Sequence, residues 1–408
     1  MTESRHYYGW WVLAGLFLVY AATNGILMHT LPLLYPQLMS EFGWSEVDVT
    51  LPATVLFVIS AVTSPPVGAL LDRYSPRRII ITGVSGMAIG LALYAQVTAL
   101  WQLVAVYALL AVSLSLSGLV SNMVVLSRWF FERRGRATGI LLMASSFGGA
   151  VFPLVLGATM AGGDWRSSLY AFAGITVVLT MLPLMFVIRD RPPTATSERS
   201  SAVRPTPPPG IRLLQALRQS EFYLIAIATA AVWFSIIAMV QHQSIYLARD
   251  VGIDAAQLPR LFSVFFACSV VGKFGFGWLS DRLDKGLTMS LSVATLIAGL
   301  LLLRHVDAAG GLSVFGFAVV AGIGFSGAFT TIQLLIARFY AGIAYGKILA
   351  LLVLMDTLAG ALGTRVVGQM RTTLGSYLPA IDLMIGCCVV AIGCVEIVRR
   401  GRLYRSAM

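Results

Sequence analysis

The sequence has 408 residues, of which 58% are hydrophobic and only 12% are charged, and its mean hydropathy is +0.83. A soluble chain would be about a quarter charged, so this composition excludes a soluble globular protein and indicates that lipid surrounds most of the chain. The net charge of +11 would favour a nucleic-acid partner in a soluble protein, but its distribution along the chain decides against nucleic acid.

Twelve apolar runs follow one another along the chain. Each has roughly 20 residues or more, which at a rise of about 1.5 Å per residue is enough to cross ~30 Å of hydrocarbon. The expected spans are 10–36, 48–71, 78–98, 100–127, 136–160, 168–189, 220–247, 258–280, 286–305, 311–337, 346–370 and 376–398. The sequence therefore predicts an all-α membrane protein with twelve transmembrane helices.

A polar segment separates two sets of six spans. Residues 190–219 are rich in Pro, Ser, Thr and Arg, which is typical of a solvated linker. We therefore expect an N-terminal six-helix half at 1–189 and a C-terminal six-helix half at 220–408. All four cysteines lie in apolar runs, and there is no CxxC pair and no metal-type histidine cluster, so we predict neither a metal site nor a cofactor.

The basic residues are divided unequally between the two sides of the membrane. With the N-terminus inside, 22 of the 29 Lys and Arg residues fall in cytoplasmic loops and tails, five fall outside, and Lys273 and Arg365 lie within spans. This bias is the positive-inside signal, so both termini are predicted to be cytoplasmic. The preference for Arg over Lys and the Ala-, Gly- and Leu-rich composition favour the inner membrane of a bacterium with GC-rich DNA.

One loop motif occurs twice, after the second and after the eighth span. Both copies read G-x-L-x-D-R followed by basic residues, with Gly68, Asp72, Arg73 and Arg77 in the first copy and Gly277, Asp281 and Arg282 in the second. They are 209 residues apart, from glycine to glycine and from aspartate to aspartate. Parallel duplication of a six-helix half is typical of transporters. We expect the glycine to let helix ends approach, the aspartate to face a helix N-terminus, and the arginines to hold a cytoplasmic gate closed. The alternative is that these residues only end helices and set topology.

The repeated motif resembles that of the major facilitator superfamily, and the resemblance covers the whole chain. The stretch Tyr8-Gly9-Trp10-Trp11 and the stretch from Arg128 to Gly139, which includes Arg136, are similar to the monocarboxylate transporter and oxalate/formate antiporter branch. The resemblance implies the major facilitator fold and alternating access between two halves, and it places Arg136 with the gating residues. Branch membership does not identify the substrate.

Two charged residues lie at matching depths within spans. Lys273 precedes Asp281 by eight residues, or ~12 Å, and Asp356 follows Gly346 by ten residues, or ~15 Å. In the resembling branch an arginine four residues before the motif glycine binds the substrate carboxylate, and Lys273 occupies this position. The resembling antiporters carry lysine at the span-11 position, so Asp356 is a departure that puts a dicarboxylate substrate in doubt.

We hypothesise that spans 8 and 11 are neighbours and that Lys273 pairs with Asp356 across the cavity. One alternative is a static salt bridge that stabilises the C-terminal half. In another, Lys273 binds a substrate carboxylate while Asp356 takes up a proton or turns aside. In a third, Asp356 binds a proton or a cation, and Lys273 tunes its affinity for that ligand.

Other polar side chains at mid-span are further candidates for contact with a substrate. In the fold that the resemblance implies, spans 1, 4, 7 and 10 line the central path, and polar groups in spans face protein or a wet cavity more often than lipid. The candidates in these spans are Asn24, His29, Asn122, Gln241, His242, Tyr246 and Gln333. His242 is preferred over His29 as a ligand or proton site, and a hydrogen bond between packed helices is the alternative for each histidine.

The leading interpretation is a secondary transporter for a small organic anion, most simply a monocarboxylate, with a co-moving proton as an option. The alternative is an efflux transporter for amphiphilic or cationic compounds with Asp356 as anchor. Expected partners are a carboxylate substrate, the lipid bilayer and protons, and the functional unit is expected to be a monomer. An enzyme is disfavoured because the sequence has no nucleophile–base pair, nucleotide loop or metal set, and a membrane sensor is disfavoured because its tails and linker are short.

Overall fold

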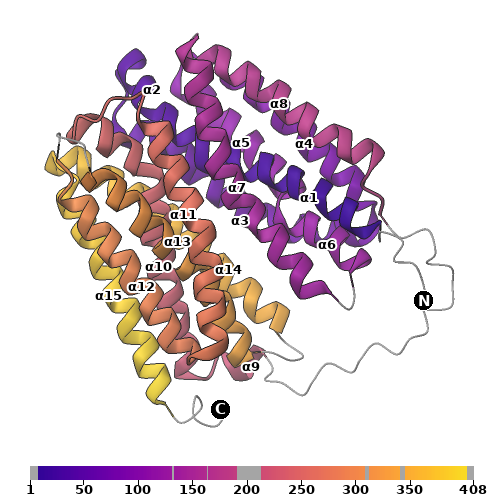
Figure 1. The fold of residues 1–408 in the computed structure, drawn as a ribbon, viewed down its shortest axis with the longest axis vertical. Coiled ribbons are helices and arrows are strands. Elements are labelled where there is room, and N and C mark those ends of the chain that lie inside the picture. The colour runs from indigo at the N-terminus through magenta and orange to yellow at the C-terminus, as the bar shows by residue number, and fades with distance from the viewer. Residues whose placement is uncertain are drawn as a thin grey trace. The chain divides into compact units, whose positions relative to one another are not determined.

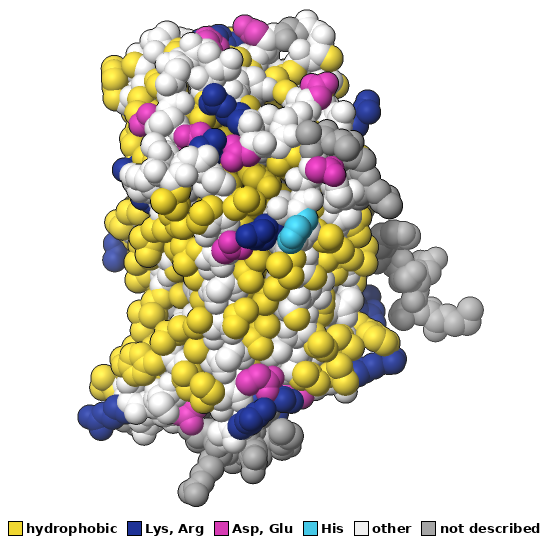
Figure 2. Space-filling model, turned by 90° about the vertical axis from the view of Figure 1, so that its left-hand side faces the viewer, with side chains coloured by type: hydrophobic (Ala, Val, Ile, Leu, Met, Phe, Trp, Pro, Cys, Tyr) yellow, Lys and Arg dark blue, Asp and Glu magenta, His cyan; other side chains and the backbone are white. Residues whose placement is uncertain are grey.

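The computed structural model describes residues 8–130, 133–162, 164–190, 213–307, 312–340 and 345–401. Within these ranges twelve helical segments are long and apolar enough to cross a membrane, which confirms the predicted all-α fold with twelve spans. Figure 2 shows one face of the molecule, on which hydrophobic side chains form a broad band and charged side chains gather mainly on either side of it. This distribution is expected of helices that are surrounded by lipid along their middle.

The first six spans contain ten helical elements. They are α1 (Gly9–Asn24), the π-helical turn η1 (Gly25–Thr30), the 3₁₀ turn η2 (Leu31–Leu34), α2 (Tyr35–Phe42), α3 (Glu46–Arg73), α4 (Pro76–Tyr94), α5 (Leu100–Ser117), α6 (Leu119–Trp129), α7 (Arg134–Ala161) and α8 (Trp165–Phe186). Span 1 runs without interruption from α1 through η1 and η2 to α2, and span 4 consists of α5 and α6.

The last six spans contain fewer interruptions. Their elements are α10 (Ser220–Ile245) with the π-helical turn η3 (Tyr246–Asp250), α11 (Leu258–Arg282), α12 (Lys285–Arg304), α13 (Leu312–Tyr340), α14 (Tyr345–Leu374) and α15 (Leu378–Arg400). A short helix, α9 (Leu213–Ala216), precedes them and lies within the predicted linker. Residues 191–212 of that linker are outside the described residues.

The chain divides into two compact units, and in Figure 1 most of the first is indigo to magenta and most of the second is rose to yellow, while Gly43–Thr54 of the second is indigo. The first unit comprises Met1–Phe42 and Val55–Val203, and the second comprises Gly43–Thr54 and Arg204–Met408. The first residues of α3, up to Thr54, therefore pack with the helices of the C-terminal part of the chain, although we predicted the whole segment 1–189 as one half.

The same helix pairs pack together in both units. In the first unit α1 packs on α7 and α8, and α4 packs on α5 and α8. In the second unit α10 packs on α14 and α15, and α12 packs on α13 and α15. Counted by span, these are the same four pairings, displaced by six spans. The repeat predicted from the loop motif thus extends to the packing of the helices.

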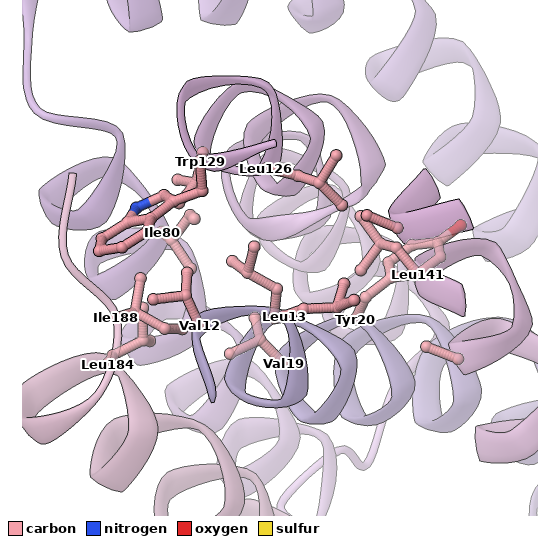
Figure 3. Packing of buried hydrophobic residues seen from close by; sticks show 14 of the residues in the cluster. Val12, Leu13, Val19, Tyr20, Ile80, Leu126, Trp129, Leu141, Leu184 and Ile188 are labelled. Atoms are coloured by element: carbon pink, nitrogen blue, oxygen red, sulfur yellow. The ribbon is translucent and has the colours of Figure 1, made fainter. Parts of the chain in front are cut away.

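A buried cluster of apolar side chains holds the first unit together (Figure 3). Leu13 of α1 lies in this cluster with Leu126 and Trp129 of α6 and Leu184 of α8. The Trp129 indole N–H donates to the carbonyl of Arg189 at 2.7 Å, so the polar atom of this buried ring is satisfied. This bond fixes the end of span 4 to the residues that follow α8.

Candidate functional site

The two copies of the loop motif make contacts within their own units. The Arg77 guanidinium donates to the carbonyls of Leu184 at 2.5 Å and Met185 at 2.8 Å. These carbonyls belong to the last turn of α8, where unsatisfied oxygens and the helix dipole favour a cation. In the second copy the Arg282 guanidinium carbon lies 3.8 Å from the centre of the Trp278 ring. Each arginine thus has a defined partner near its own loop.

The remaining motif residues are exposed or lack close neighbours. A Cβ atom added at Gly68 or Gly277 would meet no atom within 4 Å, so the predicted close approach of helix ends at these glycines is absent from this structure. Asp72, Arg73, Asp281 and Arg136 are exposed. The gating role of these residues therefore remains a prediction, and the contacts present in this structure are those of Arg77 and Arg282.

The motif repeat includes a pair of helix caps that sequence reasoning missed. Ser75 caps α4, and its side chain accepts from the Arg78 N–H. Asp284, which is 209 residues later, caps α12 and accepts from the Leu287 N–H at 3.0 Å. Asp284 also pairs with Arg338 of α13, with 3.4 Å between nitrogen and oxygen. Because the offset equals that of the motif, these caps belong to the same repeat.

Asn122 holds the break in span 4. Its side-chain amide donates to the carbonyls of Ser117 and Gly118, both at 2.7 Å, and the residue is fully buried. Gly118 has an extended backbone between α5 and α6, so two carbonyls near the break need donors. This contact explains Asn122 structurally, and its predicted role in binding substrate stays a prediction.

A chain of polar side chains joins α1 and η1 to α7 in the first unit. Ser145 of α7 donates to the Asn24 side-chain oxygen at 2.5 Å, and its oxygen lies 3.1 Å from His29 Nε2. Two of the predicted candidates, Asn24 and His29, are thus brought together by a serine that the sequence did not single out. Tyr20, one turn before Asn24, also faces Ser145.

Glycines set the distance between these two helices. A Cβ atom at Gly148 would lie 2.3 Å from the Ala21 carbonyl oxygen and 2.9 Å from the Gly25 Cα. Only glycine fits where two helix backbones come this close. The crossing of α1 and η1 with α7 is called below the first seam, defined by Ala21, Gly25, Ser145 and Gly148.

The equivalent crossing in the second unit joins α10 to α14. A Cβ atom at Gly363 would lie 2.5 Å from the Phe234 carbonyl oxygen, and one at Gly360 would lie 2.8 Å from the Ile237 side chain. This crossing is called below the second seam, defined by Phe234, Ile237, Gly360 and Gly363. Its backbone-to-backbone contact matches that of the first seam.

His242 is fixed by two hydrogen bonds at one end of the second seam. Its Nε2 lies 2.8 Å from the Thr364 carbonyl, and its Nδ1 lies 2.9 Å from the Tyr377 hydroxyl. Burial, and then the nearby carboxylates of Glu46 and Asp250, raise the pKa of Tyr377 well above its ordinary value. The phenol therefore stays protonated and donates to Nδ1, while Nε2–H donates to the carbonyl.

This arrangement favours the packing role that was the alternative for His242. Both ring nitrogens are used inside the protein, and the residue is 2% exposed. Tyr246 donates to the Leu303 carbonyl at 3.2 Å and packs against the Tyr377 ring. Gln241 is buried and Gln333 is half-buried. A direct role of these residues in binding substrate stays a prediction.

Lys273 lies over an aromatic ring of the second unit. Its Nζ is 5.7 Å from the centre of the Phe329 ring of α13, and Phe329 in turn packs edge-on against Trp233 of α10. The position is fixed by Gly272, where an added Cβ would lie 2.3 Å from the Ile323 carbonyl oxygen. The Trp233 indole nitrogen is buried without a hydrogen-bond partner among the described residues. Trp233 and Phe329 could not be identified from the sequence, because aromatic residues are common in apolar runs and do not by themselves indicate a site.

The predicted pair of Lys273 with Asp356 is absent from this structure. Neither carboxylate oxygen of Asp356 has a hydrogen-bond partner among the described residues, and the Lys273 Nζ lies over Phe329. The reason is the helix packing, since α11 packs mainly on α13 whereas α14 packs mainly on α10. Asp356 is 2% exposed and lies beside the Thr229 hydroxyl of α10.

Two six-helix sets with repeated packing, and with polar groups buried at mid-membrane, define the class of protein as a secondary transporter. The sequence matches the model of the Major Facilitator Superfamily over residues 12–393. The chain belongs to this superfamily, and it is a transporter and not an enzyme.

Similarity to individual proteins agrees with this family. Monocarboxylate transporter 13 of Bos taurus is 25% identical over 373 residues, which cover 91% of this chain and 84% of that protein. The Fujikurins efflux protein of Gibberella fujikuroi is 24% identical over 253 residues, which cover 60% of this chain and 49% of that protein. A bacterial homologue of the human lysosomal transporter Spinster, in an inward-facing and unoccupied conformation, has a TM-score of 0.76 at 15% identity over 99% of both chains. This last likeness shows the fold.

Proposed function

We propose that this protein is a secondary transporter of a small monocarboxylate and that Lys273 is the anchor of the carboxylate. The observation that carries the proposal is the group formed by Lys273, Phe329 and Trp233 in the second unit. An ammonium supplies charge and up to three N–H donors, and the buried indole N–H of Trp233 is a further donor without an acceptor among the described residues. A carboxylate is the small ligand whose charge and acceptor oxygens match donors of these two kinds.

The aromatic rings favour a ligand with a small apolar part. Phe329 and Trp233 pack edge-on with ring centres 5.7 Å apart, and these surfaces would contact the carbon atoms next to the carboxylate. Lys273 is the one cation of this group, and a monocarboxylate carries one negative charge. The similarity to monocarboxylate transporter 13 supports the same substrate class.

A thermal-shift screen of the purified, detergent-solubilised protein tests this proposal. The probes are acetate, lactate and pyruvate at two pH values, on the wild type, Lys273→Ala and the matched control Lys285→Ala at the first residue of α12. A ligand at about 100 times its Kd stabilises the folded state by about 2.7 kcal/mol. We expect an acid to raise the melting temperature of the wild type and the control, but not of Lys273→Ala. A shift that survives in Lys273→Ala would contradict the proposed anchor.

The competing proposal is efflux of amphiphilic or cationic compounds with Asp356 as anchor. The similarity to the Fujikurins efflux protein and the unpartnered carboxylate of Asp356 favour it. The 2% exposure of Asp356 opposes it, because a bulky cation would have to separate α10 from α14 to reach the carboxylate. Adding tetraphenylphosphonium to the same screen distinguishes the two, since stabilisation of the wild type by this cation and by no acid would support efflux.

We also propose that the protein lies in the cell inner membrane with both termini in the cytoplasm. The distribution of the 29 basic residues along the sequence supports this orientation. Reporter fusions test it, with alkaline phosphatase joined after Ser376 between α14 and α15 and after Gly401. Activity after Ser376 and inactivity after Gly401 are expected, and the reverse result would overturn the orientation.

A further inference from the structure

We propose that Asp356 and Thr229 form a proton-binding site within the second seam, separate from the group around Lys273. Side chains of α10 and α14 surround this carboxyl group, and the site needs neither a substrate nor a lysine. If the protein is the proposed transporter, the site would couple proton movement to transport, and only this coupling role rests on the proposed function.

The first argument is the cost of a buried carboxylate. Asp356 is 2% exposed, and neither of its oxygens has a hydrogen-bond partner among the described residues. Asp356 lies eleven residues into α14, far from both ends of a 30-residue helix. An ionised carboxylate in such surroundings costs several kcal/mol unless an opposite charge or donors compensate. The group is therefore expected to carry a proton while α14 is packed in this way.

The second argument is the neighbouring hydroxyl group. The Thr229 hydroxyl of α10 lies beside Asp356 and donates to the Ala226 carbonyl at 3.3 Å. A protonated carboxyl group carries an O–H donor that a carboxylate lacks, and the Thr229 oxygen has a lone pair that can accept it. A proton taken up by Asp356 would thus give the buried carboxyl group a hydrogen bond that leaves the bond from Thr229 to Ala226 in place.

The third argument excludes the other charged groups around α14. Ten Asp, Glu, His, Lys or Arg side chains other than Asp356 are carried by α14 and by the helices α10, α13 and α15 that pack against it. They are Glu221, His242, Arg338, Lys347, Arg365, Arg371, Asp382, Glu396, Arg399 and Arg400. Six of them have partners elsewhere, namely His242, Arg338, Asp382, Glu396, Arg399 and Arg371. Glu221 and Arg400 lie in the first turn of α10 and at the last residue of α15, and Lys347 lies in the first turn of α14. Arg365 is nine residues after Asp356, which is about half a turn around the helix axis, so it lies on the opposite side of α14 from Asp356.

A metal ion fits the site less well than a proton. Hard cations require several oxygen ligands, and the described residues contain no cluster of three or more His, Cys, Asp or Glu side chains that could hold one. The proposed ligand is therefore a proton, taken from water when the seam opens and returned when it opens again. Gly363 brings the backbone of α14 against that of α10, and Gly360 lies against the Ile237 side chain, so we expect water to reach the carboxyl group when these two helices separate.

Infrared difference spectroscopy of the purified full-length protein tests the site. We expect the wild type to show a carbonyl band of a protonated carboxylic acid that disappears as the pH rises. The band should be missing in Asp356→Asn and retained in Glu396→Gln, a matched control whose carboxylate is paired with Arg399. Persistence of the full band in Asp356→Asn would overturn the proposal.

Thermal melting provides a second measurement that does not depend on transport. Raising the pH should lower the melting temperature of the wild type by several degrees, because it leaves an unpartnered carboxylate in the seam. Asp356→Asn, whose amide can still donate to Thr229, should fold and lose this pH dependence. Stabilisation by sodium ions at constant pH, absent in Asp356→Asn, would show a metal site instead. If the band and the pH dependence are present but no acid binds, the proposed substrate fails while the proton site stands.

Discussion

In the first unit α7 crosses α1 and η1 through Gly148, and in the second unit α14 crosses α10 through Gly363, with the same approach of backbone to backbone. Ser145 precedes Gly148 by three residues, and Asp356 precedes Gly363 by seven, so each polar residue lies on the side of its helix that carries the glycine. The chemistry of these two polar residues differs. Ser145 is hydrogen-bonded to Asn24 and lies at hydrogen-bond distance from His29, whereas the Asp356 oxygens have no hydrogen-bond partner in the part of the chain that the structure describes.

The difference shows how a duplicated architecture can hold two kinds of site. Backbone contact is set by small residues and tolerates little change, so both seams keep their glycines. The polar position beside each contact is free to differ. In the first seam it connects side chains into a chain of hydrogen bonds. In the second it leaves a buried carboxyl group whose oxygens have no hydrogen-bond partner among the described residues, and this group is the proposed proton site.

The largest expected effect comes from breaking both seams at their glycines. Gly148→Ala would place a Cβ atom 2.3 Å from the Ala21 carbonyl, and Gly363→Ala would place one 2.5 Å from that of Phe234. Each should destabilise its unit by about 3 kcal/mol, because backbone cannot yield as a side chain can. Thermal melting in detergent measures the loss. Gly174→Ala in α8, where nothing lies within 4 Å, is the control and should be neutral or stabilising.

A smaller loss of stability is expected when the hydrogen bonds of His242, at one end of the second seam, are removed. His242→Leu removes bonds to Thr364 and Tyr377 and leaves both partners buried, at a cost of about 2–3 kcal/mol. Tyr377→Phe removes only the second bond and should cost about 1 kcal/mol. Melting curves of the two variants give the comparison. Equal losses in both would show that the Thr364 bond contributes nothing.

The hydrogen bonds of Ser145 in the first seam should contribute less to the free energy of unfolding than those of His242 in the second. Ser145→Ala removes its contacts to Asn24 and His29 and should cost about 1–2 kcal/mol. Thr159→Val on the same helix, whose hydroxyl bonds only carbonyls of its own helix, is the matched control. A loss no greater than that of the control would mean that the chain across the first seam is not stabilising.

The smallest effects compare the two equivalent helix caps. Ser75→Ala and Asp284→Ala should each cost about 1 kcal/mol, since each leaves an N–H of the first turn without its acceptor. Asp284→Ser keeps the cap and removes only the ion pair with Arg338, which is worth about 1 kcal/mol or less. If Asp284→Ser is as damaging as Asp284→Ala, the ion pair and not the cap stabilises this helix start.

The number and order of the spans could be predicted from the sequence because lipid selects long apolar runs, and twelve such runs became twelve spanning segments. Depth within the membrane could be predicted for the same reason. Lys273 and Asp356 do lie well inside their helices, but depth fixes a position along a helix axis and not around it. Their partners are therefore set by packing that a single sequence does not reveal.

Contacts between distant parts of the chain were beyond prediction for a similar reason. His242 is bonded to residues 122 and 135 positions later, and nothing local in the sequence marks these partners. Ser145 was overlooked because serine is common in membrane helices, where it usually bonds a carbonyl of its own helix. Asn122 and Gly118 are a case in which a local signal existed, since an extended glycine divides one apolar run into α5 and α6.

The π-helical turns η1 and η3 end corresponding helices of the two units, after α1 and after α10. A π turn accommodates one residue more than an α turn, and one residue corresponds to about 100° of rotation around a helix axis. Conversion of either turn to an α turn would therefore swivel the segment beyond it without lengthening the chain. The first span of each unit thus has one extra residue at its π turn. The residues before the turn can stay packed at the glycine crossing while the residues after it rotate around the helix axis.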